Sequence, residues 1–215
     1  LRKRKFSVNH KTVQRLMKEL GLVCRVRMKK YRSYKGEVGK IAPNLLNRDF
    51  RAEKPNQKWV TDVTEFSLFG EKLYLSPILN LCSSDLVSYT ISDHPVLSMV
   101  TTMLDKAFEK IPDGTGLILH SDQGWQYQHK HYQKMLEDKG VRQSMSRKGN
   151  CLDNAVMENF FGLLKQEMYY GVVYYSYEEL KSAIEQYIKY YNEQRIKEKL
   201  GWKSPVQYRR SLSAA

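Results

Sequence analysis

The chain has 215 residues, of which 41% are hydrophobic, and it carries a formal net charge of +13. This length suits one α/β domain with a small extension, and the apolar content supports a buried core, which excludes a disordered chain. The sequence has no membrane-spanning apolar run, no signal peptide and no G-x-x-x-x-G-K-S/T loop, so neither a membrane nor ATP is an expected partner.

The positive charge is concentrated near the N-terminus. Residues 1–51 hold 16 Lys or Arg and 3 Asp or Glu, whereas residues 52–215 hold 20 of each kind. A basic segment joined to a neutral domain is typical of a protein that binds a polyanion, and its phosphate contacts would make binding depend on salt. Nucleic acid is the expected partner. An anionic membrane is the alternative, but no basic helix with a wide apolar face supports it.

The first predicted element is a helix that Ser7 can cap and that runs to about Leu20. Its apolar positions would leave four polar side chains facing outward as in a recognition helix, which makes them candidate DNA contacts: Lys11, Gln14, Arg15 and Lys18. Only six residues precede Ser7, too few for the preceding helix of a helix-turn-helix, so we expect the sequence to begin inside a DNA-binding module. Residues 24–40 are interpreted as a basic linker. We therefore divide the chain into residues 1–50, a partial helix-turn-helix with linker, and residues 51–215, a catalytic core with a helical tail.

The core is predicted to alternate strands and helices in the order βββαβαβα, an α/β pattern that begins with an antiparallel meander. The expected strands are 59–68, 72–81, 86–92, 117–120 and 141–145. The expected helices are 96–110, 129–138, one that carries Glu158, and 177–193.

Three carboxylates occupy informative places in this pattern. Asp62 lies inside the strand-like run WVTDVTEF, where an unpaired charge is costly unless a cation lies beside it. Asp122 follows the apolar run LILH and therefore emerges at a strand's C-terminal end, where open α/β sheets form their sites. Glu158 is separated from Asp122 by 35 intervening residues. It lies off the apolar stripe of its predicted helix. Each could be a solvated or capping acid, but the ordered strand, strand, helix contexts favour a shared site.

Polar and cationic residues surround Glu158. Helical spacing places Asn154 and Lys165 on its face, where they could contact DNA phosphate. The preceding loop SRKGNCLD adds Arg147 and Lys148, and its Asn150 or Asp153 is expected to cap the helix.

Clustered carboxylates suit hard divalent cations, so we expect two Mg²⁺ ions per site, with Mn²⁺ able to substitute. Two ions about 3.5–4 Å apart would activate the attacking oxygen and stabilise the leaving oxygen of a displacement at phosphorus. Cys24, Cys82 and Cys151 form no C-x-x-C pair, which favours a reducing intracellular setting without zinc. His120 could be a base, a metal ligand or a structural residue.

Four ordered blocks resemble bacterial insertion-sequence transposases with a retroviral-integrase-like D,D-35-E core: WVTDVTEF, LHSDQGWQY, SRKGNCLDNAVMENFFGLLKQE and YNEQRIKEKLGWKSPVQY. The resemblance implies a ribonuclease-H-like mixed five-stranded sheet flanked by helices and preceded by a basic helical DNA-binding segment. It implies Asp62, Asp122 and Glu158 as catalytic metal ligands for DNA nicking and 3′-hydroxyl strand transfer, with Lys165 contacting DNA. Gln123 departs from the arginine often found in relatives.

The resemblance further implies the downstream product of two fused reading frames, a homo-oligomer on element ends and target DNA, and a bacterial cytoplasmic, nucleoid-associated location. Two other functions stay open at this point. A ribonuclease-H-like nuclease would cleave DNA without joining it, and an inactive transposase fragment would only bind DNA.

Overall fold

The computed structural model describes residues 8–22 and 39–213, with the backbone alone at Cys151 and Ser213. Contacts divide the chain into two compact units, Leu1–Lys30 and Tyr31–Ala215, which are described separately. Ser7 and most of the predicted linker at 24–40 lie outside the described residues. Residues 39–50 belong to the second unit and pack on its core, since Leu46 is buried there and the Leu45 amide donates a hydrogen bond to Ser144. The division of the chain at residue 50 stays a prediction.

The described part of the first unit is one helix, α1 (His10–Glu19). Asn9 caps it, because its side chain accepts a hydrogen bond from the Lys11 amide at 3.0 Å. None of the residues of α1 is buried. Lys11, Gln14, Arg15 and Lys18 are all exposed, and Arg15 pairs with Glu19 one turn later. Their polar face is therefore available, and their DNA contacts remain predictions.

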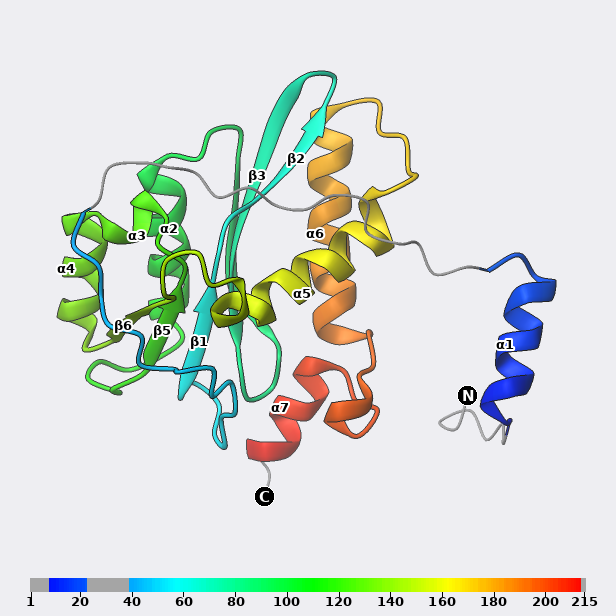
Figure 1. Cartoon of the computed structure of the whole chain (residues 1–215), viewed down its shortest axis with the longest axis horizontal. Coiled ribbons are helices and arrows are strands. Elements are labelled where there is room, and N and C mark those ends of the chain that lie inside the picture. The colour runs from blue at the N-terminus through cyan, green and yellow to red at the C-terminus, as the bar shows by residue number, and fades with distance from the viewer. Residues whose placement is uncertain (1–7, 23–38, 214–215) are drawn as a thin grey trace. The chain divides into compact units, whose positions relative to one another are not determined.

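The second unit is built on one mixed sheet of six strands (Figure 1). The strands are β1 (Lys58–Thr61), β2 (Thr64–Leu68), β3 (Glu71–Asn80), β4 (Leu86–Ser92), β5 (Ile118–Ser121) and β6 (Arg142–Met145). Both β1 and β2 pair with β3, at different parts of its length, so they are two halves of one interrupted strand. This interruption is the difference from the predicted five-stranded sheet, which treated 59–68 as one strand.

The pairing of β1 with β5 positions the carboxylates. These strands are parallel, with Val60 opposite His120, and β5 is in turn parallel to β6. Parallel strands end at the same edge of a sheet. Asp62 and Asp122 each lie two residues beyond this matched pair, so the register places them side by side.

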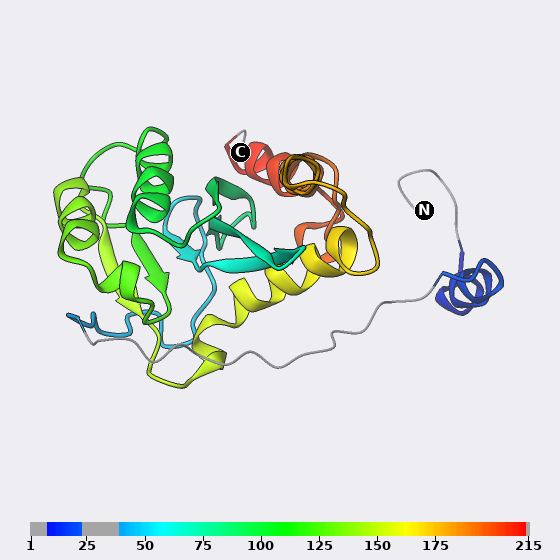
Figure 2. The ribbon, with the colours of Figure 1, turned by 90° about the horizontal axis from the view of Figure 1, so that it is seen from above.

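Helices cover both faces of the sheet (Figure 2). They are α2 (Leu97–Phe108), α3 (Trp125–Gln128), α4 (Lys130–Lys139), α5 (Ala155–Leu164), α6 (Tyr177–Glu193) and α7 (Pro205–Ser213), with short turns η2 (Cys151–Asn154), η3 (Lys165–Tyr169) and η4 (Glu198–Leu200). Side chains alternate between the faces of a strand. Val60 accordingly packs in the core under α5 and α6, whereas its neighbour Trp59 packs in the core under α2 and α4. None of the described helices has an apolar stretch long enough to traverse a lipid bilayer.

Candidate active site

Asp62 occupies the break between β1 and β2. Its Oδ1 accepts a hydrogen bond from the Val63 amide at 2.7 Å, and its Oδ2 accepts one from Nδ2 of Asn154 at 2.8 Å. The side chain is half-buried. Asn154 directly precedes α5, so this second bond joins the sheet to the helix that carries Glu158.

Asp122 directly follows β5 and begins a tight turn. Its Oδ1 accepts a hydrogen bond from the Gly124 amide at 2.8 Å. A Cβ at Gly124 would lie 3.0 Å from that oxygen and 3.2 Å from the ring of Tyr127, so glycine permits this close approach. The turn therefore fixes Asp122 at the edge of the sheet where Asp62 also lies.

The negative charges of the two aspartates repel each other. Burial raises the pKa of Asp62 well above its usual value, and the negative charge of Asp122 raises it further. Burial likewise raises the pKa of Asp122. Withdrawing two adjacent carboxylates from water is unfavourable unless a cation neutralises them. The pair is therefore suited to hold positive charge.

Glu158 lies in the first turn of α5 and is half-buried. Its charge also raises the pKa of Asp62, by less than burial or Asp122 does, which places it in the same electrostatic environment. No three His, Cys, Asp or Glu side chains among the described residues converge tightly enough to hold a metal ion. Glu158 thus stands somewhat apart from the aspartate pair.

The donor set fits a hard divalent cation. Asp62, Asp122 and Glu158 supply carboxylate oxygens, which Mg²⁺ and Mn²⁺ prefer. Oδ1 of Asn154 is a buried oxygen without a hydrogen-bond partner in the described structure, and it lies on the amide group that contacts Asp62. A cation or its water would satisfy this oxygen.

Asp153 anchors the loop before α5. Its fully buried carboxylate accepts hydrogen bonds from both the backbone and the guanidinium of Arg147, and from Arg48 and Asn44. The Arg147 guanidinium is the largest influence that holds the pKa of Asp153 far below its usual value. The expectation that Asp153 or Asn150 caps the helix is therefore wrong: Asn154 is the N-cap residue, and Asp153 is an ion-pair centre.

His120 fixes the same loop to the sheet. Its Nδ1 lies 2.8 Å from the Ser144 hydroxyl and its Nε2 lies 2.9 Å from the Asp153 carbonyl oxygen. A carbonyl can only accept, so Nε2 carries the proton and Nδ1 accepts from Ser144. Burial lowers the pKa of His120, which favours this neutral form. Both ring nitrogens are engaged, so this geometry supports the structural role for His120.

The remaining predicted residues lie around the loop and helix. Lys165 begins the π-helical turn η3, with its ammonium 5.2 Å from the centroid of the Phe66 ring. Lys148 is exposed in the loop, whereas Arg147 uses its guanidinium on Asp153. Gln123 donates from its side chain to the Ser146 carbonyl at 3.0 Å. Phosphate contacts by Asn154, Lys165, Arg147 and Lys148 stay predictions.

Sequence reasoning missed two contributors to this site. Tyr127 is 1% exposed, and after burial the charges of Asp62 and Asp122 are the largest causes that raise its pKa, so it lies within the electrostatic environment of the pair. Its place in the block LHSDQGWQY was the available signal. No local sequence signal pointed to Arg48, because its partner Asp153 lies 105 residues away.

Family models match residues 52–151 and, separately, residues 158–212 as integrase core domain, and residues 1–30 as an HTH-like domain. Over 202 residues the chain is 54% identical to a protein of Escherichia coli K12 named as transposase InsK for insertion sequence element IS150. That match covers 94% of this chain and 71% of InsK. A transposase-like protein of Haemophilus influenzae is 52% identical, with 94% of this chain and 93% of the relative covered.

Solved structures with the same fold come from retroviral enzymes. The HTLV-2 integrase catalytic core domain in complex with magnesium matches with a TM-score of 0.59 at 16% identity, covering 74% of this chain and 99% of that one. A simian T-cell lymphotropic virus intasome in complex with PP2A regulatory subunit B56 gamma matches with a TM-score of 0.62 at 16% identity. This match covers 90% of this chain and 66% of that one.

The mixed sheet flanked by helices, which this chain shares with these structures, defines an integrase-type ribonuclease-H-like fold. The 54% and 52% identity to the two relatives places the chain in one family within this class. The chain belongs to the bacterial insertion-sequence transposases with an integrase core domain, and its function is DNA transposition.

Proposed function

We propose that this chain is a D,D-35-E polynucleotidyl transferase that nicks DNA at element ends and joins the resulting 3′-hydroxyl to target DNA. The observation that carries this proposal is the side-by-side placement of Asp62 and Asp122 with Glu158 in electrostatic reach of them. Residues at the ends of adjacent parallel strands are where open α/β sheets build their sites.

Asp62, Asp122 and Glu158 would hold two Mg²⁺ ions, or Mn²⁺ in their place, and the buried oxygen of Asn154 is a further candidate ligand. Bound ions would supply activation of the attacking oxygen and stabilisation of the leaving oxygen in the displacement at phosphorus. The HTLV-2 integrase core has been described with magnesium, which supports this choice of ion.

The protein's own contribution is positioning and exclusion of water. The hydrogen bond from Asn154 orients Asp62, and the Gly124 amide orients Asp122. The buried Tyr127 ring near the pair would exclude water, which strengthens electrostatic interactions there. The Asp153 and His120 contacts hold the loop that begins α5. A correctly placed phosphodiester would then need little reorganisation of the protein.

DNA is the partner of this family, and we propose element ends and target DNA as its two substrates. Lys165, Asn154, Arg147 and Lys148 flank Glu158 in the sequence, and we propose that they meet phosphate groups near the reacting bond. The exposed face of α1 would contact DNA through Lys11, Gln14, Arg15 and Lys18. We further propose a homo-oligomer on DNA, supported by the dimeric and trimeric forms described for the HTLV-2 integrase core.

A nuclease function is less well supported, because such enzymes usually place a fourth carboxylate at the site. The two nearest candidates in the sequence are both used elsewhere. Asp153 pairs with Arg147 and Arg48, and Glu65 pairs with Lys72 at 3.0 Å. Neither carboxylate is left to complete a four-acid site.

The proposal is tested with an oligonucleotide assay that contains Mg²⁺ or Mn²⁺, pre-nicked element-end DNA with a free 3′-hydroxyl, and supercoiled target. We expect joined products from the wild type and their loss by about 10³-fold or more in Glu158→Gln, since a metal ligand is removed while the shape is kept. Glu185→Gln, on the exposed side of α6, is the matched control and should join DNA normally. Cleavage without joining would instead identify a nuclease.

A further inference from the structure

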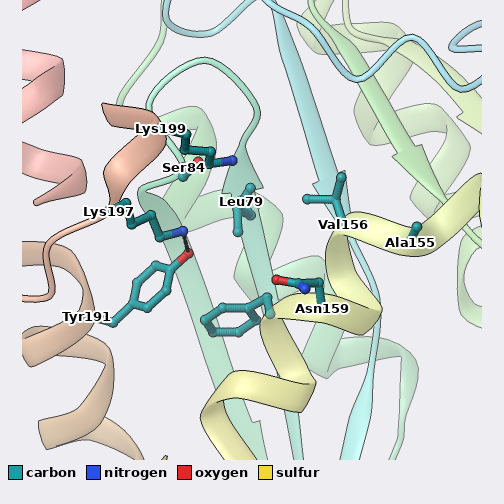
Figure 3. Close-up of a pocket in the computed structure, with 9 residues that line it drawn as sticks. Leu79, Ser84, Ala155, Val156, Asn159, Tyr191, Lys197 and Lys199 are labelled. Atoms are coloured by element: carbon teal, nitrogen blue, oxygen red, sulfur yellow. Dashed lines mark hydrogen bonds between the residues drawn. The ribbon is translucent and has the colours of Figure 1, made fainter. Parts of the chain in front are cut away.

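A cavity of about 220 Å³ lies beside the first turns of α5 (Figure 3). It is enclosed by the end of β3, the start of α5, the end of α6 and the turn η4. Its apolar wall comes from Leu79, Val156 and Phe160. Its polar groups come from four different segments of the core: Ser84, Asn159, Tyr191, and the lysine pair Lys197 and Lys199.

Lys197 and Lys199 make this cavity electropositive. Neither ammonium forms an ion pair with a carboxylate among the described residues, and the nearest influential acid, Glu167, is already held by Arg195 and Tyr187. Lys197 donates to the Tyr191 hydroxyl at 2.5 Å and lies 4.5 Å from the centre of that ring. Burial, then the charges of Lys199 and Arg195, lower the pKa of Lys197 to about 7.

The backbone that carries the pair is held in place. Lys197 and Lys203 form an antiparallel bridge, and the Lys197 carbonyl accepts hydrogen bonds from the Leu200 and Trp202 amides. Leu200 is buried against the core, and Gly201 takes the left-handed conformation with φ of 63° that ends the turn. Both lysines are thus presented on a fixed turn rather than on a free tail, which lowers the entropy cost of binding.

An oxyanion would resolve this arrangement. It would favour the charged form of Lys197 and offset the repulsion between this ammonium group and that of Lys199. The Ser84 hydroxyl and the Asn159 amide could donate hydrogen bonds to its oxygens. A cavity of about 220 Å³ holds such a group with some of its waters. Asn159 follows Glu158 directly in α5, so the cavity begins about a third of a helical turn from that residue.

We propose that this cavity, formed by Lys197, Lys199, Ser84 and Asn159, is a binding site for a backbone phosphate group of DNA. The inference rests on the proposed function for the identity of the polyanion. It adds a contact on another face of α5 than the one that carries Glu158, so that DNA would be held by two faces of this helix.

The test measures how fast each lysine of the full chain reacts with an amine-acylating reagent at pH 7, with mass spectrometry as the readout and EDTA present. A DNA duplex at about ten times its Kd should slow labelling of Lys197 and Lys199 by about tenfold, because binding leaves about one site in eleven free. Lys189, exposed on α6, is the internal control and should be protected much less.

Inorganic phosphate forms the second arm and distinguishes DNA from a free anion. Protection by duplex supports the proposal. Protection by phosphate but not by duplex overturns it, since the cavity would then take a free phosphate, and so does protection no greater than that of Lys189. The assay contains no divalent metal and does not depend on DNA cleavage or joining. Protection of the two lysines can therefore be measured even if the chain binds DNA without joining ends.

A variant pair gives an independent measurement. Lys197→Gln with Lys199→Gln should reduce the slope of log K against log salt concentration by about 0.9 for one lost phosphate contact. Lys181→Gln with Lys189→Gln removes the same charge from exposed positions of α6 and should change the slope less. If the half-buried Lys197 is needed for folding, the slope is measured with Lys199→Gln alone. An equal change in both double variants would overturn the proposal.

Discussion

At the residue scale, the site keeps Asp62 in an electrostatically unfavourable state. Its pKa is raised by burial first and by Asp122 second, so the folded chain holds this proton more tightly than the unfolded chain does. The resulting penalty is absent in acid, where the group is neutral in both states, and grows as pH rises through the raised pKa. Function here works against stability.

We therefore expect Asp62→Asn to stabilise the metal-free protein at pH 7. The gain should be about 1 kcal/mol in the free energy of unfolding, a modest figure because the side chain is still partly open to solvent. Urea unfolding in EDTA measures it, and the difference from wild type should shrink as the pH falls toward 4.

Addition of Mg²⁺ should reverse this order. An ion that binds only the folded state stabilises it by mass action, so the wild type should gain stability and the variant should gain little. A variant that is less stable than the wild type at pH 7 without metal would contradict the electrostatic account of this site.

At the element scale, the loop before α5 depends on Asp153. Its pKa is lowered in the folded chain, mainly by Arg147, so its contribution to stability is present above the ordinary aspartate pKa of about 4 and is lost as pH falls below it. Asp153→Asn should cost about 1–3 kcal/mol at pH 7, less than for a wholly buried pair because both guanidiniums are half-exposed.

The same variant should also slow strand transfer, because the loop positions Asn154 and the start of α5. Hydrogen exchange of the amides in 146–158 and the joining assay measure the two effects. Asp105→Asn, at an exposed position of α2, is the control and should change neither. Unchanged exchange in Asp153→Asn would mean that the ion pairs do not hold the loop.

Elements were predictable where a local pattern was strong. The strand 86–92 is observed with the same bounds, and the helix 177–193 likewise. The break at Asp62 was missed because β-branched residues flank it on both sides and read as one strand. α3 was missed because four residues are too few to show a helical period.

The site was predictable only in part, for a similar reason. Asp62 and Asp122 could be placed because each follows or interrupts an apolar strand. The role of Asp153 could not be placed, because its partner Arg48 lies in a basic segment whose cations all look equally suited to phosphate. Pairing between distant segments leaves no local pattern in the sequence.

At the scale of the whole molecule, charge is separated from the catalytic core. Residues 1–40 carry most of the excess positive charge. Their removal should make DNA binding weaker and less dependent on salt, because each lost phosphate contact reduces the slope of log K against log salt concentration by about 0.9. Fluorescence anisotropy over a salt series measures this slope, and an unchanged value would place the main DNA surface on the core.

The contacts of residues 39–50 have a mechanical consequence. Any pulling force on the chain before residue 39 enters the core through this segment. Its first bond is from Gln133 of α4 to the Lys40 carbonyl, and bonds to Met145, Ser144 and Asp153 follow. Tension on the N-terminal unit would therefore be shared between α4 and the backbone immediately before Glu158.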